Sequence, residues 1–362
     1  MDTIKKNEFS VLGFFMMRCF YIGISIHNIT YIAKQDSWIS IIIAFIVGLI
    51  PLFMFYKLND LEPNLTFHQL IKKYFGKFWG NAINIFFICT VIFHASIALW
   101  NLCNFVNSQF LFKTPVLAIA IFFMIPIVYT VNKGLKTIGR TGIILFIISI
   151  IMFISFLSIF SKMDFSNLKP TFEGGIIPIL DGALIEFSFC VLSYFPLLVV
   201  PKNNIVNNQK IMKTLLKVYL LSFFTTIIIM LAILTIFGSP LANLYQYPEF
   251  HLLKIINVAN FFQRVESVLS FQWLFDFAVS LMVFIYFIKT SVQQLVNMEH
   301  KHDLLFILGI AAVIIFLSST IFVNDTIAYD FFGNIYKYIR LFISFFMPLM
   351  ILIVCLLKRR KQ

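Results

Sequence analysis

Long apolar stretches alternate with short polar segments along the whole chain. A helix needs about 20 predominantly apolar residues to cross the hydrocarbon core of a bilayer, and ten stretches come near that length. The predicted spans are residues 9–33, 38–57, 81–108, 114–132, 141–161, 182–201, 214–238, 268–288, 304–323 and 340–357. This pattern predicts an all-α integral membrane protein in which residues 1–362 form one multi-pass domain.

Two connections between predicted spans are amphipathic. In residues 65–79, apolar side chains recur at helical spacing and Lys72, Lys73 and Lys77 fall between them. This is typical of a helix lying on the inner membrane surface. Residues 251–265 carry a second apolar stripe of this kind on the outer side. We interpret the second stripe either as an external cap over a central site or as an ordinary amphipathic connector.

Composition excludes the main alternatives to a membrane protein. The 362 residues are 60% hydrophobic and only 12% charged, whereas a soluble domain has roughly a quarter charged residues. A disordered chain is poor in apolar residues, which this chain is not. The net charge of +12, from 28 Lys and Arg against 16 Asp and Glu, would suit nucleic acid only on a soluble basic face.

The positive charges instead indicate an orientation in the membrane. With the N-terminus in the cytoplasm, about two thirds of the Lys and Arg residues fall in the inner segments, in agreement with the positive-inside rule. We therefore expect both termini in the cytoplasm, and as partner the lipid bilayer and no nucleic acid. Arg18 is close enough to the inner end of the first span to extend its side chain to the interface. Lys337 and Arg340 fall at the outer edge of the last span.

Nothing in the sequence indicates catalysis. It lacks a Walker A loop, H-E-x-x-H, G-x-S-x-G and a Rossmann glycine pattern. The five cysteines have no C-x-x-C spacing and lie in apolar runs, which indicates buried free thiols. His300 and His302 lie near Glu299 and Asp303 on a short turn, where a solvated polar cluster fits better than a metal site. We expect no enzyme activity, no metal and no cofactor.

Polar residues inside the apolar spans are the candidates for a functional site. A charge at mid-membrane costs about 2.5–3.5 kcal/mol on insertion scales, so such residues usually face a cavity or a partner. The candidate ligand-binding residues are Gly23, Ile24, Ser25, His94, Glu186, Ser188 and Asp276. A lone histidine such as His27 or His94 is more typical of a packed position. Asp276 fits a structural pair with another helix as well as a ligand contact.

The first and sixth spans both show signs of an interrupted helix. Gly23 lies among polar residues in the first span, and glycine lowers helix stability by about 1 kcal/mol. The sixth span has Gly182 before Glu186 and Pro196 after it. The two spans are equivalent in an arrangement of five plus five helices, and matching interruptions in two halves point to a transporter site. An intact first helix with a packing glycine is the alternative.

Glu186 has three interpretations. It contacts the amino group of a ligand, it titrates in proton coupling, or it is a structural acid that is hydrogen-bonded inside the protein. Acids inside the membrane are taken as functional by default, which favours the first two.

Four short motifs carry a resemblance to a known family. They are residues 35–39 (Gln-Asp-Ser-Trp-Ile), 134–140 (Gly-Leu-Lys-Thr-Ile-Gly-Arg), 178–183 (Pro-Ile-Leu-Asp-Gly-Ala) and 264–273, which begins Arg-Val-Glu and ends in Trp. Through them the chain resembles, over essentially its whole length, the B subunits of GerA-type spore germinant receptors, in the amino acid–polyamine–organocation transporter superfamily. It departs from the family at Ser25, often a glycine, and at Ile185, where a glycine often precedes the acid. We expect Arg264 and Glu266 to form a structural ion pair.

The resemblance implies two inverted five-helix repeats, residues 9–161 and 182–357, with broken first and sixth helices around a central site, as in LeuT-like transporters. It implies the spore inner membrane as location, and the A and C subunits of the same receptor as partners. It also implies that a small germinant, such as an amino acid or a nucleoside, binds as the signal for germination. A proton-coupled amino-acid permease that uses Glu186 is the alternative.

Overall fold

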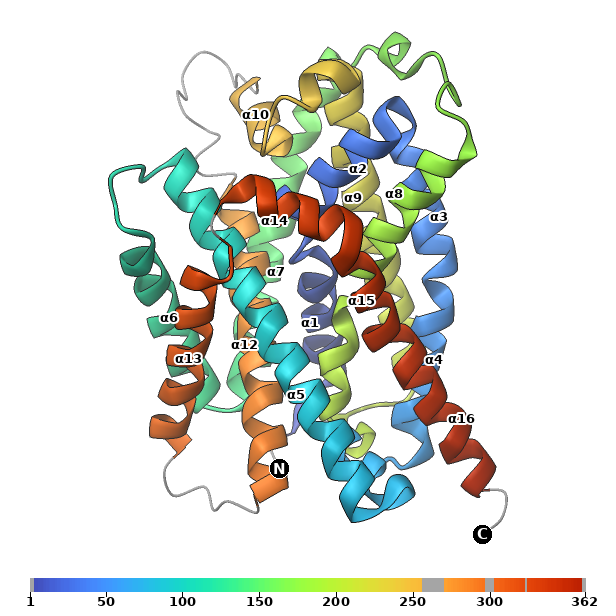
Figure 1. Ribbon diagram of the computed structural model, residues 1–362, viewed down its shortest axis with the longest axis vertical. Coiled ribbons are helices and arrows are strands. Elements are labelled where there is room, and N and C mark those ends of the chain that lie inside the picture. Colours follow the sequence, from blue (N-terminus) through green and yellow to red (C-terminus); the bar gives the residue numbers. More distant parts are fainter. Residues whose placement is uncertain (1–2, 256–269, 297–302, 323, 360–362) are drawn as a thin grey trace.

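The computed structural model describes residues 3–255, 270–296, 303–322 and 324–359, and most of them are helical. The helices pack side by side into one bundle (Figure 1). Eight helical stretches of the described residues are long and apolar enough to cross a membrane. The first, Lys6–Leu61, covers two predicted spans, and the shorter apolar helix Val116–Asn132 covers the fourth. Together these stretches account for all ten predicted spans and confirm the all-α membrane fold.

The elements of the first half of the chain run from the N-terminal strand to the seventh α-helix and two short 3₁₀ turns. Their bounds are β1 (Ile4–Lys5), α1 (Lys6–Arg18), η1 (Tyr21–Ser25), α2 (Ile26–Ala33), η2 (Lys34–Asp36), α3 (Ser37–Val47), α4 (Leu49–Leu61), α5 (Phe67–Gln109), α6 (Val116–Asn132), α7 (Leu135–Phe156), η3 (Leu157–Lys162) and η4 (Phe165–Leu168).

The second half contains the remaining helices and one more strand. Their bounds are α8 (Ile176–Phe189), η5 (Val191–Val199), η6 (Lys202–Asn204), β2 (Ile205–Val206), α9 (Ile211–Ala242), α10 (Pro248–Ile255), α12 (Phe271–Val296), α13 (Asp303–Thr320), α14 (Asp325–Phe331), η8 (Phe332–Tyr336), α15 (Lys337–Leu341), η9 (Phe342–Phe346) and α16 (Met347–Arg359).

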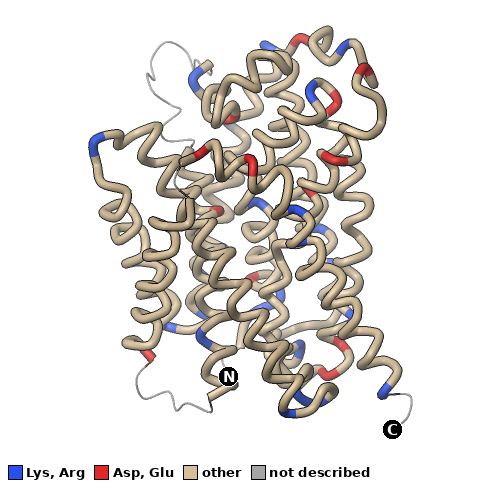
Figure 2. Tube along the Cα trace, viewed as in Figure 1, with Lys and Arg blue, Asp and Glu red and all other residues tan. Residues whose placement is uncertain are grey.

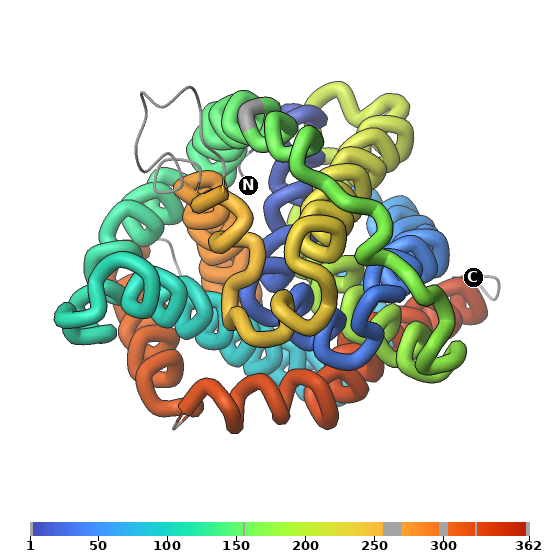
Figure 3. The backbone as a smooth tube through the Cα atoms, turned by 90° about the horizontal axis from the view of Figure 1, so that it is seen from above, coloured from blue at the N-terminus to red at the C-terminus, as the bar shows by residue number. Residues whose placement is uncertain are grey.

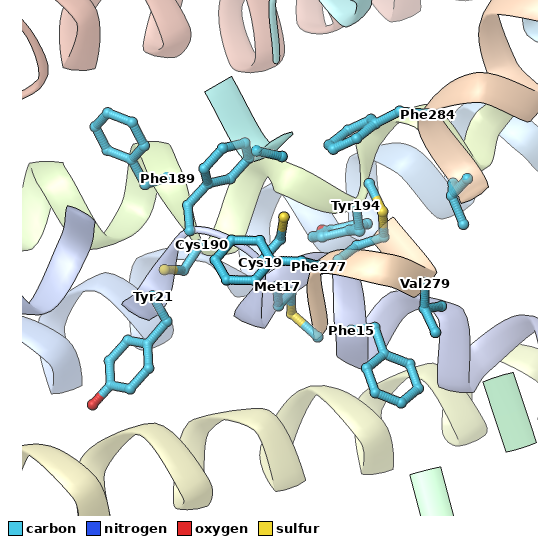
Figure 4. Close-up of a cluster of buried hydrophobic side chains, with 14 of the residues drawn as sticks. Phe15, Met17, Cys19, Tyr21, Phe189, Cys190, Tyr194, Phe277, Val279 and Phe284 are labelled. Atoms are coloured by element: carbon cyan, nitrogen blue, oxygen red, sulfur yellow. The ribbon is translucent and has the colours of Figure 1, made fainter. Parts of the chain in front are cut away.

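The first helix lies at the centre of the bundle. Helix α1 packs against α7, α9 and α12, and all of its residues from Glu8 to Arg18 are buried. In the view from above, other helices surround it (Figure 3). The core around it consists largely of aromatic and sulfur-containing side chains, including Cys19 and Cys190 (Figure 4). Four cysteines are buried and free as predicted, but Cys89 is exposed, because it lies on an outward-facing part of α5.

Both predicted helix interruptions are confirmed. Between α1 and α2, Ile22 has an extended backbone (φ −72°, ψ 132°) and Gly23 a left-handed one (φ 72°, ψ −37°). Helix α8 ends at Phe189, and the chain continues in the 3₁₀ conformation of η5, which contains Pro196. Helices α2 and α3 both pack on α8. The broken first and sixth helices therefore meet in the interior.

A short parallel strand pair is the one addition to the helical pattern in the described residues. Ile4 of β1 pairs with Ile205 of β2, and Lys5 pairs with Val206. The pair joins the segment before the broken first helix to the segment after the broken sixth helix. The sequence does not predict this strand pair, because a strand is recognised by apolar and polar residues that alternate over at least about four positions, and each of these strands has two residues.

The predicted amphipathic helix after the second span is the first part of α5. Thr66 caps it by accepting a hydrogen bond from the backbone N–H of Gln69, whose side chain accepts one from the N–H of Thr66. Gly76 has a φ of 79° and turns the chain into the long membrane-spanning part of the same helix. Only glycine adopts this conformation readily. This helix lies at the end of the bundle where the chain begins and ends (Figure 1).

The sequence motif at residues 35–39 contacts the loop before α8. The side-chain amide of Gln35 donates hydrogen bonds to the carbonyl of Pro170 (2.8 Å) and to Glu173 (3.0 Å). The Asp36 carboxylate accepts one from the backbone N–H of Phe172 (2.9 Å). The motif after the first span thus holds the loop that leads into α8, and this contact connects the two broken helices at the end of the bundle that contains α10.

Most charged residues lie at the two ends of the bundle, with a few in the middle (Figure 2). Arg18 is one of those few, and the prediction that it extends to the interface is wrong. Its side chain is buried, and its Nε lies 3.1 Å from Asp276 on α12. Arg340 is also buried in the interior, at 1% exposure, and not at the edge of the last span as predicted. Helix α1 is buried from Glu8 to Arg18, whereas α15 buries only the face that carries Lys337 and Arg340.

Helix α10 covers the end of the bundle opposite the termini and lies over the first helix (Figures 1 and 3). It contains the beginning of the predicted amphipathic stripe 251–265, with Leu252 and Leu253 buried. The rest of that stripe, the predicted pair of Arg264 and Glu266, and the predicted cluster of Glu299, His300 and His302 lie outside the described residues.

Candidate functional site

The break in the first helix leaves backbone groups without hydrogen-bond partners inside the helix. Two side chains from other helices bond to these groups instead. The carbonyl of Ile22 accepts a hydrogen bond from the Asn101 side chain of α5 (2.8 Å). The N–H of Gly23 donates to the Glu249 carboxylate of α10 (3.0 Å). Because no water is available in the bilayer core, such groups must be satisfied within the protein or by a ligand. In the described conformation the protein itself satisfies them.

Gly23 is required at the break for two reasons. Its φ of 72° is in the left-handed region, which costs a residue with a Cβ atom about 1–2 kcal/mol. A Cβ atom at this position would also lie 2.5 Å from Cε1 of Tyr247 and 2.9 Å from Oδ1 of Asn101. The space beside Gly23 is therefore filled by Tyr247, so a ligand reaches the break only if α10 moves.

Ser25 and Glu186 join the two broken helices. The Ser25 hydroxyl donates a hydrogen bond of 2.5 Å to Oε2 of Glu186, and both residues are 0% exposed. The other oxygen of Glu186, Oε1, is buried without a hydrogen-bond partner. The structure thus brings together the two residues that the sequence predicts, one from each interrupted span.

Three other predicted site residues lie in different surroundings. Ser188 donates to the backbone carbonyl of Lys337 on α15 (3.0 Å). Asp276 is held by Arg18, which also donates to Thr225 (2.8 Å). These contacts match the structural alternative for Asp276.

His94 is a buried residue of α5. Its Nδ1 is 2.7 Å from the Thr90 carbonyl, and its ring packs against Phe20 and Tyr336. Of the predicted set, therefore, Gly23, Ile24, Ser25 and Glu186 form one cluster, and Ser188, Asp276 and His94 do not belong to it.

Sequence reasoning missed Glu249, Asn101 and Tyr247 as neighbours of the break. Glu249 and Tyr247 lie in a connection that reads as solvent-exposed, yet both are 0% exposed. Burial raises the pKa of Glu249 to about 8 from 4.5, against the opposing effect of the hydrogen bond from Gly23. Asn101 stands out in the sequence only as a polar residue in an apolar span.

The break offers groups of both kinds that a zwitterion needs. The Gly23 N–H, which Glu249 occupies here, is a donor for a carboxylate, and Glu186 is an acceptor for an amino group. Each of these two acids keeps one oxygen, Oε1 of Glu186 and Oε2 of Glu249, buried without a hydrogen-bond partner. In the described part of the chain, no group of three His, Cys, Asp or Glu residues is arranged to hold a metal ion.

Comparison with known proteins identifies the family. Residues 10–326 match the family of spore germination proteins named Spore_permease. The chain belongs to this family. Spore germination protein XB of Bacillus anthracis is 24% identical over 332 residues, which cover 91% of this chain and 90% of that protein. Spore germination protein KB of Bacillus subtilis (strain 168) is 21% identical over 342 residues, which cover 91% and 89%.

This spore germination protein shares its fold with a protein of known structure, MhsT. The crystal structure of MhsT in complex with L-phenylalanine matches 98% of this chain and 99% of that chain, with a TM-score of 0.53 and 12% identity. At this identity the match shows the fold alone. It agrees with a LeuT-like all-α fold for this spore germination protein. The family of spore germination proteins is not a family of enzymes.

Proposed function

We propose that this chain is the membrane subunit of a spore germinant receptor. It binds a small nutrient germinant, an amino acid or a nucleoside, at the break of the first helix next to Glu186, and binding triggers germination. The observation that carries the proposal is the joining of the two broken helices by Ser25 and Glu186 beside the Gly23 N–H. Family membership supports the role in germination.

The described conformation is closed over this site, because Tyr247 and Glu249 occupy the space beside Gly23. A ligand drives a conformational change only through different affinities for the two states. We propose that the germinant replaces Glu249 at the Gly23 N–H and that α10 moves outward as it does so.

The remaining features of the receptor are part of the same proposal. The chain lies in the spore inner membrane with both termini in the cytoplasm, beside the A and C subunits of the same receptor. Its two inverted repeats are residues 9–161 and 182–357. The first and last described residues lie at the same end of the bundle, which supports an even number of spans (Figure 1).

The test is the germination response of spores that carry Gly23→Trp or Glu186→Ala. We expect both variants to reach the membrane and to lose the response to nutrient germinants, while Arg140→Met, an exposed change on α7, responds normally. A normal dose–response in both site variants would place the germinant elsewhere. Co-purification of the A and C subunits with the tagged chain tests the partners.

A proton-coupled amino-acid permease is the second candidate, and the buried Glu186 between two broken helices favours it. Uptake of labelled amino acids into proteoliposomes that contain only this chain separates the two functions. Concentrative uptake that needs a proton gradient supports the permease, and binding without uptake supports the receptor.

A further inference from the structure

Arg340 is a buried cation that has no acidic partner among the described residues. It is 1% exposed and lies in α15, within the last membrane-spanning stretch. Its Nη2 donates to the Ser193 hydroxyl (2.8 Å), but Nε and Nη1 are buried without a hydrogen-bond partner. The other buried cations of the interior differ in this respect, since Arg18 pairs with Asp276 and Lys337 with Asp181.

An arginine stays charged in a protein, so Arg340 needs compensation in the low-dielectric interior. Two aromatic faces supply part of it, because the guanidinium carbon lies 4.9 Å from the ring centre of Phe20 and 5.3 Å from that of Phe189. Attraction to an aromatic ring stabilises a cation but does not neutralise it. A counter-ion would do so.

A small cavity lies next to the guanidinium. Arg340, His94, Ser193 and Ser344 contribute its polar lining, and Phe284 is among the apolar residues that close it. The cavity is about 10 Å³, the room of a single water molecule, so a chloride ion, which is somewhat larger, needs a small outward shift of the lining side chains.

His94 supplies the second polar group of the cavity. Its Nδ1 is engaged with the Thr90 carbonyl, and its Nε2 is buried without a partner. A carbonyl oxygen only accepts, so Nδ1 carries the proton, and Nε2 bonds an anion only when it is protonated as well. The site therefore accommodates an anion together with a proton on His94.

From this arrangement we propose that Arg340 and His94 form a binding site for a small monovalent anion of about the size of chloride. The anion accepts hydrogen bonds from Nε and Nη1 of Arg340 and from Nε2 of His94. The site is separate from the proposed germinant position, because Gly23, Ser25 and Glu186 do not line this cavity. The Arg340 guanidinium lies over the rings of Phe20 and Phe189. These two rings flank the interruptions of the first and sixth helices, so occupancy stabilises the break in the described conformation.

The test is anion binding to the full chain, purified and reconstituted in nanodiscs of neutral lipid. Binding of ³⁶Cl⁻ is measured at constant ionic strength, with gluconate as the replacing ion, and thermal unfolding is followed by tryptophan fluorescence. We expect saturable chloride binding at one site and a higher unfolding temperature in chloride. Acetate and glycine are added as competitors to distinguish a free halide from the carboxylate of a ligand, and displacement by either still supports the anion site.

Arg340→Met removes the charge at similar length and should abolish saturable chloride binding. His94→Phe should weaken it at least about tenfold, since one of the charged donors is lost. Arg140→Met removes an exposed arginine of α7 and should bind chloride as the wild type does. Absence of saturable binding in the wild type overturns the proposal even if Arg340→Met fails to fold. Unchanged binding in a folded Arg340→Met variant also overturns it.

Discussion

Replacing Gly23 with alanine tests how α10 is held closed over the helix break. The new Cβ atom would lie 2.5 Å from Tyr247 and 2.9 Å from Asn101, both side chains that are fully buried. The left-handed φ of 72° adds about 1–2 kcal/mol of backbone strain. If Tyr247 moves away to relieve the contact, Glu249 leaves the Gly23 N–H, which costs about 1–3 kcal/mol for a buried group left unsatisfied.

The backbone strain is present as long as the helix is broken. The lost hydrogen bond, about 1–3 kcal/mol, and the close contact with Tyr247 act on the closed conformation alone, because α10 can swing away from the alanine in an open one. Each 1.4 kcal/mol changes an equilibrium about tenfold. A destabilisation of about 3 kcal/mol therefore raises the population with α10 open by roughly 100-fold. The strain is confined to the contact between the first helix and α10, so we expect the rest of the bundle to keep its stability.

Hydrogen–deuterium exchange of the purified chain in nanodiscs measures this opening. Peptides from α10 should exchange roughly 100-fold faster in Gly23→Ala than in the wild type, and peptides from α12 should not change. Gly309→Ala is the matched control, because it lies in α13 with ordinary helical φ and no heavy atom within 4 Å of the added Cβ. Exchange in α10 at the wild-type rate in Gly23→Ala would refute the reasoning from contact and strain.

Three further changes test the interior polar contacts. Arg18→Met leaves Asp276 buried without its partner and should cost about 3–5 kcal/mol of stability; the double variant Arg18→Met/Asp276→Leu should recover most of the lost unfolding temperature, and equal values for single and double variants would contradict the pairing. Ser25→Ala removes the hydrogen bond to Glu186, which is worth about 1.5–3 kcal/mol if that acid is charged. It should raise the germinant concentration at which spores respond about tenfold. An unchanged threshold would place the ligand elsewhere. The pKa of Glu249 is about 8 when α10 is closed, against 4.5 for an exposed glutamate, so the closed form binds the proton more tightly and loses stability as the pH rises from about 5 to about 8. Exchange in α10, corrected for its intrinsic pH dependence, should therefore increase over this range in the wild type and stay level in Glu249→Gln; parallel curves would show that another group is responsible.

The sequence alone was sufficient for the spans and for the positions of both breaks. A helix that crosses a bilayer needs about 20 apolar residues, so long apolar runs have few alternative interpretations. Gly23 and Pro196 disfavour a continuous helix through local backbone chemistry, which is independent of the rest of the fold. The same holds for Glu186, whose placement in an apolar run already indicates a buried acid.

Only the tertiary structure decided which groups meet. Glu249 reaches Gly23 across 226 positions of sequence, and Asn101 reaches Ile22 across 79. Arg18 and Arg340 have the same sequence signature, a charge near the end of an apolar run, yet one has an acidic partner and the other does not. Whether such a charge extends to the interface or stays inside depends on which helices surround it, because the cost of burying an ion is set by the partners that packing brings within a few ångströms.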